Sequence, residues 1–215
     1  MELNRLAHGL RNGIGPRTVI LGRHGRTVHN RDGRIMGRSD SPLTPEGLTV
    51  PLTLANLLAQ EGVGRIFCSS LGRARTTAEV YGSKIWLAVT GTDAMAELSC
   101  GEWEGKTRLE TIGERGFLRS TWNDRPPRGE SYLDAETRVG AFVDELLRLP
   151  ETETVLVVGH ASVNRVFLKL WLGIPEEVAI RVDFPHETLH FLRARSEVVR
   201  VDATGARHTG LLFYL

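Results

Sequence analysis

The stretch Thr154-Val-Leu-Val-Val-Gly-His160 decides the fold class of this 215-residue chain. Residues 155–158 are apolar at every position, and a short apolar run that ends at a glycine is typical of a strand buried on both faces. Such strands belong to parallel sheets that helices cover on both sides. A helix is predicted directly after the stretch, over about residues 162–172.

Strands and helices alternate on both sides of this stretch. We expect further strands at residues 18–21, 65–68, 85–89, 187–194 and 197–202, and another near Leu211. The helices are predicted at residues 44–60, 73–81 and 131–149, and residues 101–130 read as loops with a helical excursion. Pro51 is expected to kink or restart the first of these helices.

This alternation predicts a single α/β domain over residues 18–215, a three-layer α/β/α arrangement around a mostly parallel sheet. Residues 1–17 stand apart as an N-terminal extension. Their apolar residues recur at helical spacing, which favours a short docked helix or a partly ordered tail over a transit peptide.

Composition excludes several classes of protein. The chain is 41% hydrophobic and 25% charged, which argues against a disordered chain, and its longest apolar run is far shorter than a membrane span. Lys and Arg total 27 against 26 Asp and Glu, so net charge indicates neither nucleic acid nor a membrane as partner. Cys68 and Cys100 have neither metal-site nor disulfide spacing and suit a reducing, cytoplasmic location as buried residues.

Basic residues follow three of the predicted strands. These segments are Leu21-Gly-Arg-His-Gly25, Cys68-Ser-Ser-Leu-Gly-Arg73 and Gly159-His-Ala161. Ligands of open α/β sheets bind beyond the carboxyl ends of the strands, so two arginines and two histidines are expected to meet in one crevice. Clustered cations repel unless an anion compensates them, and a phosphoryl group can accept from all of them. The alternative is a set of surface arginines paired with glutamates.

These segments resemble the signature blocks of the histidine phosphatase superfamily, also called phosphoglycerate-mutase-like. The matching blocks occur in order along residues 18–165. They are LGRHGRTVHN (residues 21–30), GRSDSPLTPEG (37–47), SSLGRARTTA (69–78), ELSCGEWEG (97–105), RGES (128–131) and VGH (158–160). The resemblance implies the phosphoglycerate-mutase-like fold and a metal-independent phosphomonoester hydrolase with no cofactor.

The resemblance also implies a role for each matching residue. His24 would attack phosphorus and carry the phosphoryl group, and Glu97 would protonate the leaving oxygen. Arg23, Arg73 and His160 would hold the phosphoryl oxygens by charge. Further substrate contacts are implied at Asn30, Gly37 and Ala161.

The chain departs from the family pattern at Arg26, where many members carry Glu; the added charge favours a more anionic substrate. Glu102 and Glu104 flank Trp103 and are interpreted as a solvated turn around a buried tryptophan. We interpret three further histidines as pocket-wall or structural residues rather than metal ligands, namely His29, His186 and His190.

Two other functions are compatible with these motifs. One is mutase-type phosphotransfer, although Glu97 and His160 lie only 63 positions apart, which resembles the shorter phosphatase form. The other is a non-catalytic phospho-ligand binding module, although the residues that the resemblance makes catalytic are all present. The expected partner is a small phosphorylated substrate. Phosphosugars, phosphoglycerates, nucleotide-like phosphates and a ribazole phosphate fit the motifs equally, and the motifs leave the oligomeric state open.

Overall fold

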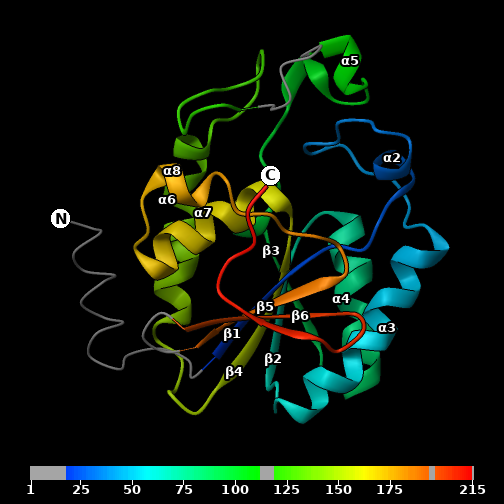
Figure 1. Ribbon diagram of the computed structural model, residues 1–215, viewed down its shortest axis with the longest axis vertical. Coiled ribbons are helices and arrows are strands. Elements are labelled where there is room, and N and C mark those ends of the chain that lie inside the picture. Colours follow the sequence, from blue (N-terminus) through cyan, green and yellow to red (C-terminus); the bar gives the residue numbers. More distant parts are fainter. Residues whose placement is uncertain (1–17, 112–118, 194–196, 215) are drawn as a thin grey trace.

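A seven-stranded sheet in the order β3-β2-β4-β1-β5-β6-β7 forms the centre of the computed structural model, which describes residues 18–111, 119–193 and 197–214 (Figure 1). The strands are β1 (Thr18–Arg23), β2 (Arg65–Ser69), β3 (Val89–Thr92), β4 (Thr154–Gly159), β5 (Thr188–Arg193), β6 (Glu197–Asp202) and β7 (Arg207–Thr209). The first four pair in parallel, and β5 to β7 extend the sheet as antiparallel strands. The predicted α/β class with a mostly parallel core is confirmed.

Helices cover both faces of this sheet (Figure 1). Helices α3 (Pro45–Gln60) and α4 (Gly72–Ile85) pack on one face, and α6 (Tyr132–Leu146) and α7 (Ala161–Leu172) pack on the other. The short helices are α2 (Val28–Arg31), η1 (Asp93–Met95), η2 (Gly101–Trp103), α5 (Arg108–Thr111) and α8 (Glu176–Ala179). The three-layer arrangement follows from this placement.

Strand β4 shows why its sequence is apolar throughout. Val155 and Val157 point into the core under α6 and α7, whereas Leu156 and Val158 point into the core under α3 and α4. All four side chains are fully buried, because the pleat sends alternate residues to opposite faces and both faces are covered.

The strand predicted at residues 85–89 is misplaced. Helix α4 continues to Ile85, Trp86 takes a left-handed conformation with φ 60°, and β3 begins only at Val89. Ile85, Leu87 and Val89 all pack against the same core, so their alternation imitates a strand although the first of them ends a helix.

Other expectations differ in detail. Helix α3 runs without interruption through Pro51, and α6 ends at Leu146, before the predicted residue 149. The final strand is β7 at residues 207–209, so Leu211 lies beyond it. The extension predicted at residues 1–17 lies outside the described residues. No helix in the described part of the chain is long and apolar enough to span a bilayer.

Candidate active site

The two histidines of the motifs are neighbours because β1 and β4 pair in parallel. The last pair in register joins Arg23 to Gly159, so His24 and His160 follow side by side. The backbone N–H of His24 donates to the carbonyl of Gly159 at 3.0 Å, which continues the ladder beyond the strands. The two imidazole rings lie 5.0 Å apart between centroids.

The His24 ring is held in one tautomer. Its Nδ1 lies 2.8 Å from the carbonyl oxygen of Gly25, and a carbonyl only accepts, so Nδ1 carries the proton and Nε2 keeps its lone pair. Burial lowers the pKa of His24 well below its usual value, and the nearby positive charges of Arg23 and Arg73 lower it further. At neutral pH the imidazole is therefore uncharged.

His160 is fully buried behind the His24 ring. Its Nε2 lies 2.8 Å from the Ser69 hydroxyl, at the carboxyl end of β2, whereas its Nδ1 is buried without a hydrogen-bond partner in the described part of the structure. Burial lowers the pKa of His160, and the charges of Arg73 and Arg23 add to this effect. An anion beside the ring would offset both causes, since it favours the protonated form.

Arg23 and Arg73 enter the site from the ends of β1 and α4. Arg73 has a fully buried side chain whose Nη1 and Nη2 donate to the carbonyls of Ser39 and Gly37, each at 2.8 Å, and which pairs with Asp40 at 3.2 Å. Arg23 Nη1 donates to Phe184 O at 3.0 Å. The Nε atoms of both arginines are buried without a partner among the described residues. Each guanidinium is thus held in place with an unsatisfied donor.

Glu97 follows η1 and lies at the start of α7. Its carboxylate accepts backbone N–H bonds from Leu98 at 2.9 Å, Val163 at 3.1 Å and Ser162 at 3.2 Å. The last two are donors of the first turn of α7, which has no side-chain cap from its N-cap residue His160. Glu97 is therefore fixed next to the segment that carries the second histidine.

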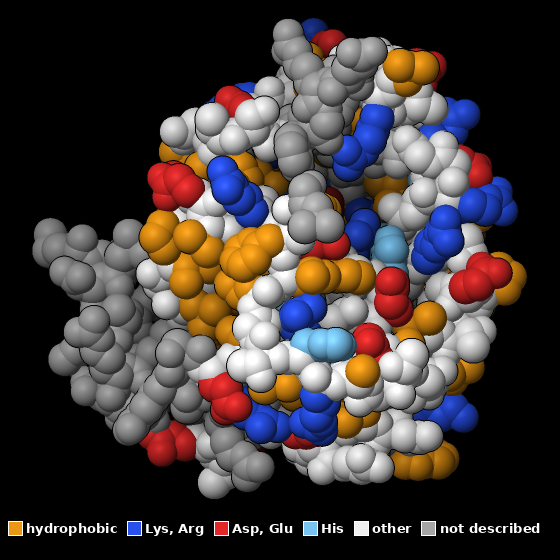
Figure 2. All heavy atoms as spheres, viewed as in Figure 1, with side chains coloured by type: hydrophobic (Ala, Val, Ile, Leu, Met, Phe, Trp, Pro, Cys, Tyr) orange, Lys and Arg blue, Asp and Glu red, His pale blue; other side chains and the backbone are white. Residues whose placement is uncertain are grey.

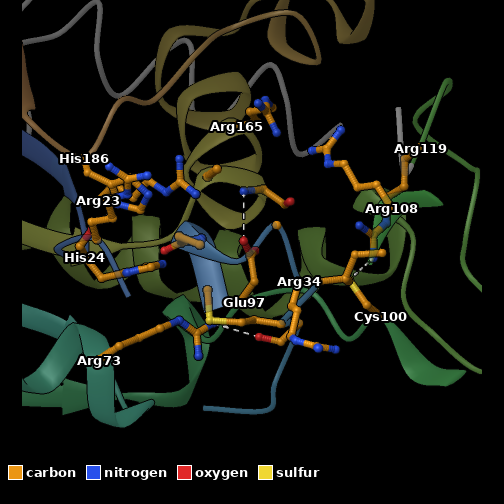
Figure 3. Close-up of a pocket in the computed structure, with 18 of the residues that line it drawn as sticks. Arg23, His24, Arg34, Arg73, Glu97, Cys100, Arg108, Arg119, Arg165 and His186 are labelled. Carbon is orange, nitrogen blue, oxygen red and sulfur yellow. Dashed lines mark hydrogen bonds between the residues drawn. The ribbon is translucent and has the colours of Figure 1, made fainter. Parts of the chain in front are cut away.

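These residues surround one cavity of about 620 Å³ (Figure 3). His24, Arg23, Arg73 and Glu97 line it, and so do the predicted substrate-contact residues Asn30, Gly37 and Ala161. His160 is fully buried and is not part of the described wall, but its ring lies directly beside that of His24, with 5.0 Å between the centroids. Seven arginines belong to the lining in all, namely Arg23, Arg26, Arg34, Arg73, Arg108, Arg119 and Arg165.

Local contacts orient the three additional substrate-contact candidates. Asn30 Oδ1 accepts from the Thr27 backbone N–H at 3.1 Å in a capping box, so its amide nitrogen is directed away from that bond. Gly37 has φ +53°, and a Cβ there would lie 2.2 Å from Glu104 Oε1. Ala161 is the first residue of α7, and the backbone N–H groups of the next two residues, Ser162 and Val163, donate to Glu97.

Two features of the site went unrecognised in the sequence. Glu104 is part of no solvated turn: its carboxylate accepts from the backbone N–H groups of Arg38, Ser39 and Cys100, and so it anchors the loop that Arg73 also holds. Trp103 is half-buried, contrary to expectation. The repeated acidic residues were the only signal in the sequence, because two of the three partners of Glu104, Arg38 and Ser39, lie 66 and 65 residues away.

His186, interpreted from the sequence as a pocket-wall or structural residue, lies next to His24. It lines the cavity, its Nδ1 donates to the His24 carbonyl at 2.7 Å, and its ring lies 5.1 Å from the His24 ring. Burial lowers the pKa of His186 to about 3, so it adds no charge at neutral pH. His190 is fully buried on β5, and Cys68 and Cys100 are both buried and free.

The charge of the cavity wall suits an anion. On the face shown in Figure 2, Lys and Arg side chains gather over the region of α2 and α5. In the described ranges, no three His, Cys, Asp or Glu residues are grouped as metal ligands. A tetrahedral dianion could accept from both guanidinium groups while an uncharged imidazole nitrogen faces it.

Comparisons with known proteins place the chain in a family. A family model described as the histidine phosphatase superfamily (branch 1) matches residues 19–206. A probable phosphoglycerate mutase GpmB of Shigella boydii is 32% identical over 170 residues, which cover 76% of this chain and 79% of that protein.

Solved structures share the fold. A mycobacterial glucosyl-3-phosphoglycerate phosphatase complexed with VO3 superposes with a TM-score of 0.76 at 23% identity, over 91% of this chain and 98% of that one. YhfR of Bacillus stearothermophilus gives 0.71 at 28% identity, over 90% and 95%. A putative alpha-ribazole-5'-P phosphatase of Escherichia coli gives 0.67 at 25% identity, over 93% and 97%.

Proposed function

Because the chain belongs to the histidine phosphatase superfamily, we propose that it hydrolyses a phosphomonoester through a covalent phosphohistidine on His24. The observation that carries the proposal is the Nδ1–H bond of His24 to the Gly25 carbonyl at 2.8 Å. It leaves Nε2 as the nucleophile, and the lowered pKa of the ring keeps that lone pair free at neutral pH.

In the first step, His24 Nε2 forms a bond to phosphorus while the bond from phosphorus to the ester oxygen breaks. The leaving oxygen takes a proton from Glu97, and the product alcohol departs. Arg23, Arg73 and His160 hold the three remaining phosphoryl oxygens, whose charge rises as the transition state forms.

In the second step, water attacks phosphorus and the bond to Nε2 breaks, which returns His24 to its neutral form. Glu97, now ionised, accepts the proton that the water loses. Inorganic phosphate leaves, and the enzyme is restored. The products are thus one alcohol and one phosphate for each ester and water consumed, and no metal takes part in either step.

Phosphotransfer of the mutase type is the second candidate, favoured by the relatives named as probable phosphoglycerate mutases. It shares the first step but transfers the phosphoryl group to a second hydroxyl rather than to water. The two reactions are distinguished by following the label from a phosphorylated substrate into inorganic phosphate or into an isomeric ester.

The proposal is tested by turnover of p-nitrophenyl phosphate without added metal and with a chelator present. We expect hydrolysis by the wild-type protein and none by His24→Ala. Binding of phosphorylated ligands without turnover by either protein would instead indicate a non-catalytic binding module. Release of inorganic phosphate from 3-phosphoglycerate without its isomerisation supports the phosphatase over the mutase.

A further inference from the structure

The cavity extends well beyond the residues that the phosphoryl chemistry uses. In Figure 3, His24, Arg23 and Arg73 lie on one side, whereas Arg119 lies on the opposite side and Glu97 lies between them. Arg165 lies above Glu97 in the same view, between Arg23 and Arg119. The reaction proposed above assigns no task to Arg119 or Arg165.

Arg119 and Arg165 are buried cations without a carboxylate partner among the described residues. Their exposed fractions are 4% and 6%, and neither forms an ion pair with any described residue. Arg165 donates to Val182 O at 2.8 Å and to the hydroxyls of Tyr132 and Tyr214, and Arg119 donates to the carbonyls of Glu130 and Ser99. All these partners are neutral groups, so within the described residues neither guanidinium is paired with a carboxylate at ion-pair distance.

Tyr132 brings the two guanidinium groups together. Its hydroxyl accepts from Arg165 Nη1 at 3.2 Å, and Arg119 lies over its ring at 5.8 Å from the centroid. Arg119 lines the cavity, and its Nη1 has no hydrogen-bond partner within the described ranges. Two buried like charges on one aromatic side chain favour an anion that accepts from both.

Arg119, Tyr132 and Arg165 lie within reach of a substrate whose phosphate is at His24. Ala161, Ser162 and Arg165 all line the cavity from one side of α7. Arg165 is four residues after Ala161, a rise of about 6 Å along the helix. A substrate with a backbone of a few carbon atoms can therefore span both ends.

We propose that Arg119, Tyr132 and Arg165 form a second anion subsite, so that the preferred substrate carries another anionic group besides the phosphate that is transferred. That group is a carboxylate or a second phosphate, which guanidinium and hydroxyl donors recognise alike. The inference rests on the proposed function and names the substrate class of the same site.

The test compares substrates that differ only in the second charge. One pair is 3-phosphoglycerate and glycerol 3-phosphate, which differ in a carboxylate against a hydroxymethyl group. The other is fructose 1,6-bisphosphate and fructose 6-phosphate, which tests a second phosphate. We expect kcat/KM to be at least about tenfold higher for the doubly anionic member of one pair, the effect of one charge-assisted hydrogen bond. The pair that shows the preference identifies the group.

Arg119→Gln should reduce this ratio to within about threefold of unity. The ratio is insensitive to partial unfolding of the variant, because both rates come from the same preparation. Arg148→Gln is the matched control, because Arg148 is exposed and does not line the cavity. This variant should keep the wild-type ratio. Ratios near unity for both wild-type pairs, or a ratio that Arg119→Gln leaves unchanged, would overturn the subsite.

Calorimetry separates this inference from the proposed function. With His24→Ala, 3-phosphoglycerate or fructose 1,6-bisphosphate should bind at least about tenfold more tightly than its singly charged counterpart, and adding Arg119→Gln should remove the difference. If the wild-type protein hydrolyses none of these esters but the binding preference persists, the phosphatase proposal fails and the subsite stands. Equal binding of both members of each pair refutes the subsite.

Discussion

Replacement of Arg73 by lysine keeps one positive charge but removes the guanidinium fork. Arg73 donates through Nη1 to Ser39 O and through Nη2 to Gly37 O, both at 2.8 Å, and its side chain is fully buried. A lysine ammonium carries its three N–H groups on one nitrogen, so it cannot reproduce the spacing by which the guanidinium reaches both carbonyls and a phosphoryl oxygen. At least one charge-assisted hydrogen bond is lost.

The size of the effect follows from that loss. A hydrogen bond to a charged group contributes about 1.5–3 kcal/mol, and each 1.36 kcal/mol is tenfold in rate. We therefore expect kcat/KM for p-nitrophenyl phosphate to fall roughly 10- to 150-fold in Arg73→Lys. The assay is steady-state release of p-nitrophenol at fixed pH and ionic strength, with folding checked by thermal melting.

Arg75→Lys is the matched control on the same helix. Arg75 is exposed and forms only an ion pair with Glu79 at 3.7 Å, so its replacement should leave kcat/KM unchanged within a factor of two. A similarly small change in Arg73→Lys, or an equal loss in both variants, would refute the assignment of Arg73 to the phosphoryl site.

Three further outcomes are expected. Glu97→Gln should slow the hydrolysis of esters with poor leaving groups more than that of p-nitrophenyl phosphate, because only poor leaving groups need the proton. Equal losses in kcat for both kinds of ester would contradict the role of Glu97 as proton donor. Gly25→Ala should lower the melting temperature, since a Cβ would lie 2.1 Å from a backbone oxygen of α3, whereas Gly140→Ala in α6 meets its nearest atom at 4.0 Å and should be stable. Burial lowers the pKa of His190 to about 3, so the folded state resists protonation while the unfolded state protonates near pH 6.5, and stability falls as the pH drops below that value. His190→Leu should reduce the loss of unfolding free energy between pH 6 and 5 by roughly 1 kcal/mol, whereas a variant of the exposed His208 to Gln should retain it; equal slopes in urea denaturation would count against the argument.

The sequence predicts those parts of the fold that short-range patterns determine. The fully apolar run of β4 indicates a strand buried on both faces, and the structure confirms it. The strand predicted at residues 85–89 is misplaced because Ile85, at the end of α4, and Leu87, in the loop after it, pack against the same core. Alternating apolar residues show that every second side chain faces the core. Both a strand and a helix end followed by a loop can produce this pattern.

The candidate site is partly foreseeable for a similar reason. Residues directly after parallel strands meet at one sheet edge, so His24 and the residues after β2 and β4 could be brought together from motifs. Arg119 could not: it is one of many arginines in this chain, and only long-range contacts with Tyr132 and Ser99 set it apart. Likewise, no local pattern shows that Glu104 holds a loop more than 60 residues earlier in the chain.

Rapid quenching in alkaline denaturant during turnover of a ³²P-labelled phosphomonoester measures the central claim most directly. We expect acid-labile label on the protein, located on His24 by peptide mass spectrometry at neutral to alkaline pH, and no label in His24→Ala. Hydrolysis at an undiminished rate by His24→Ala, or label on another residue that turns over at the steady-state rate, would contradict the phosphohistidine mechanism.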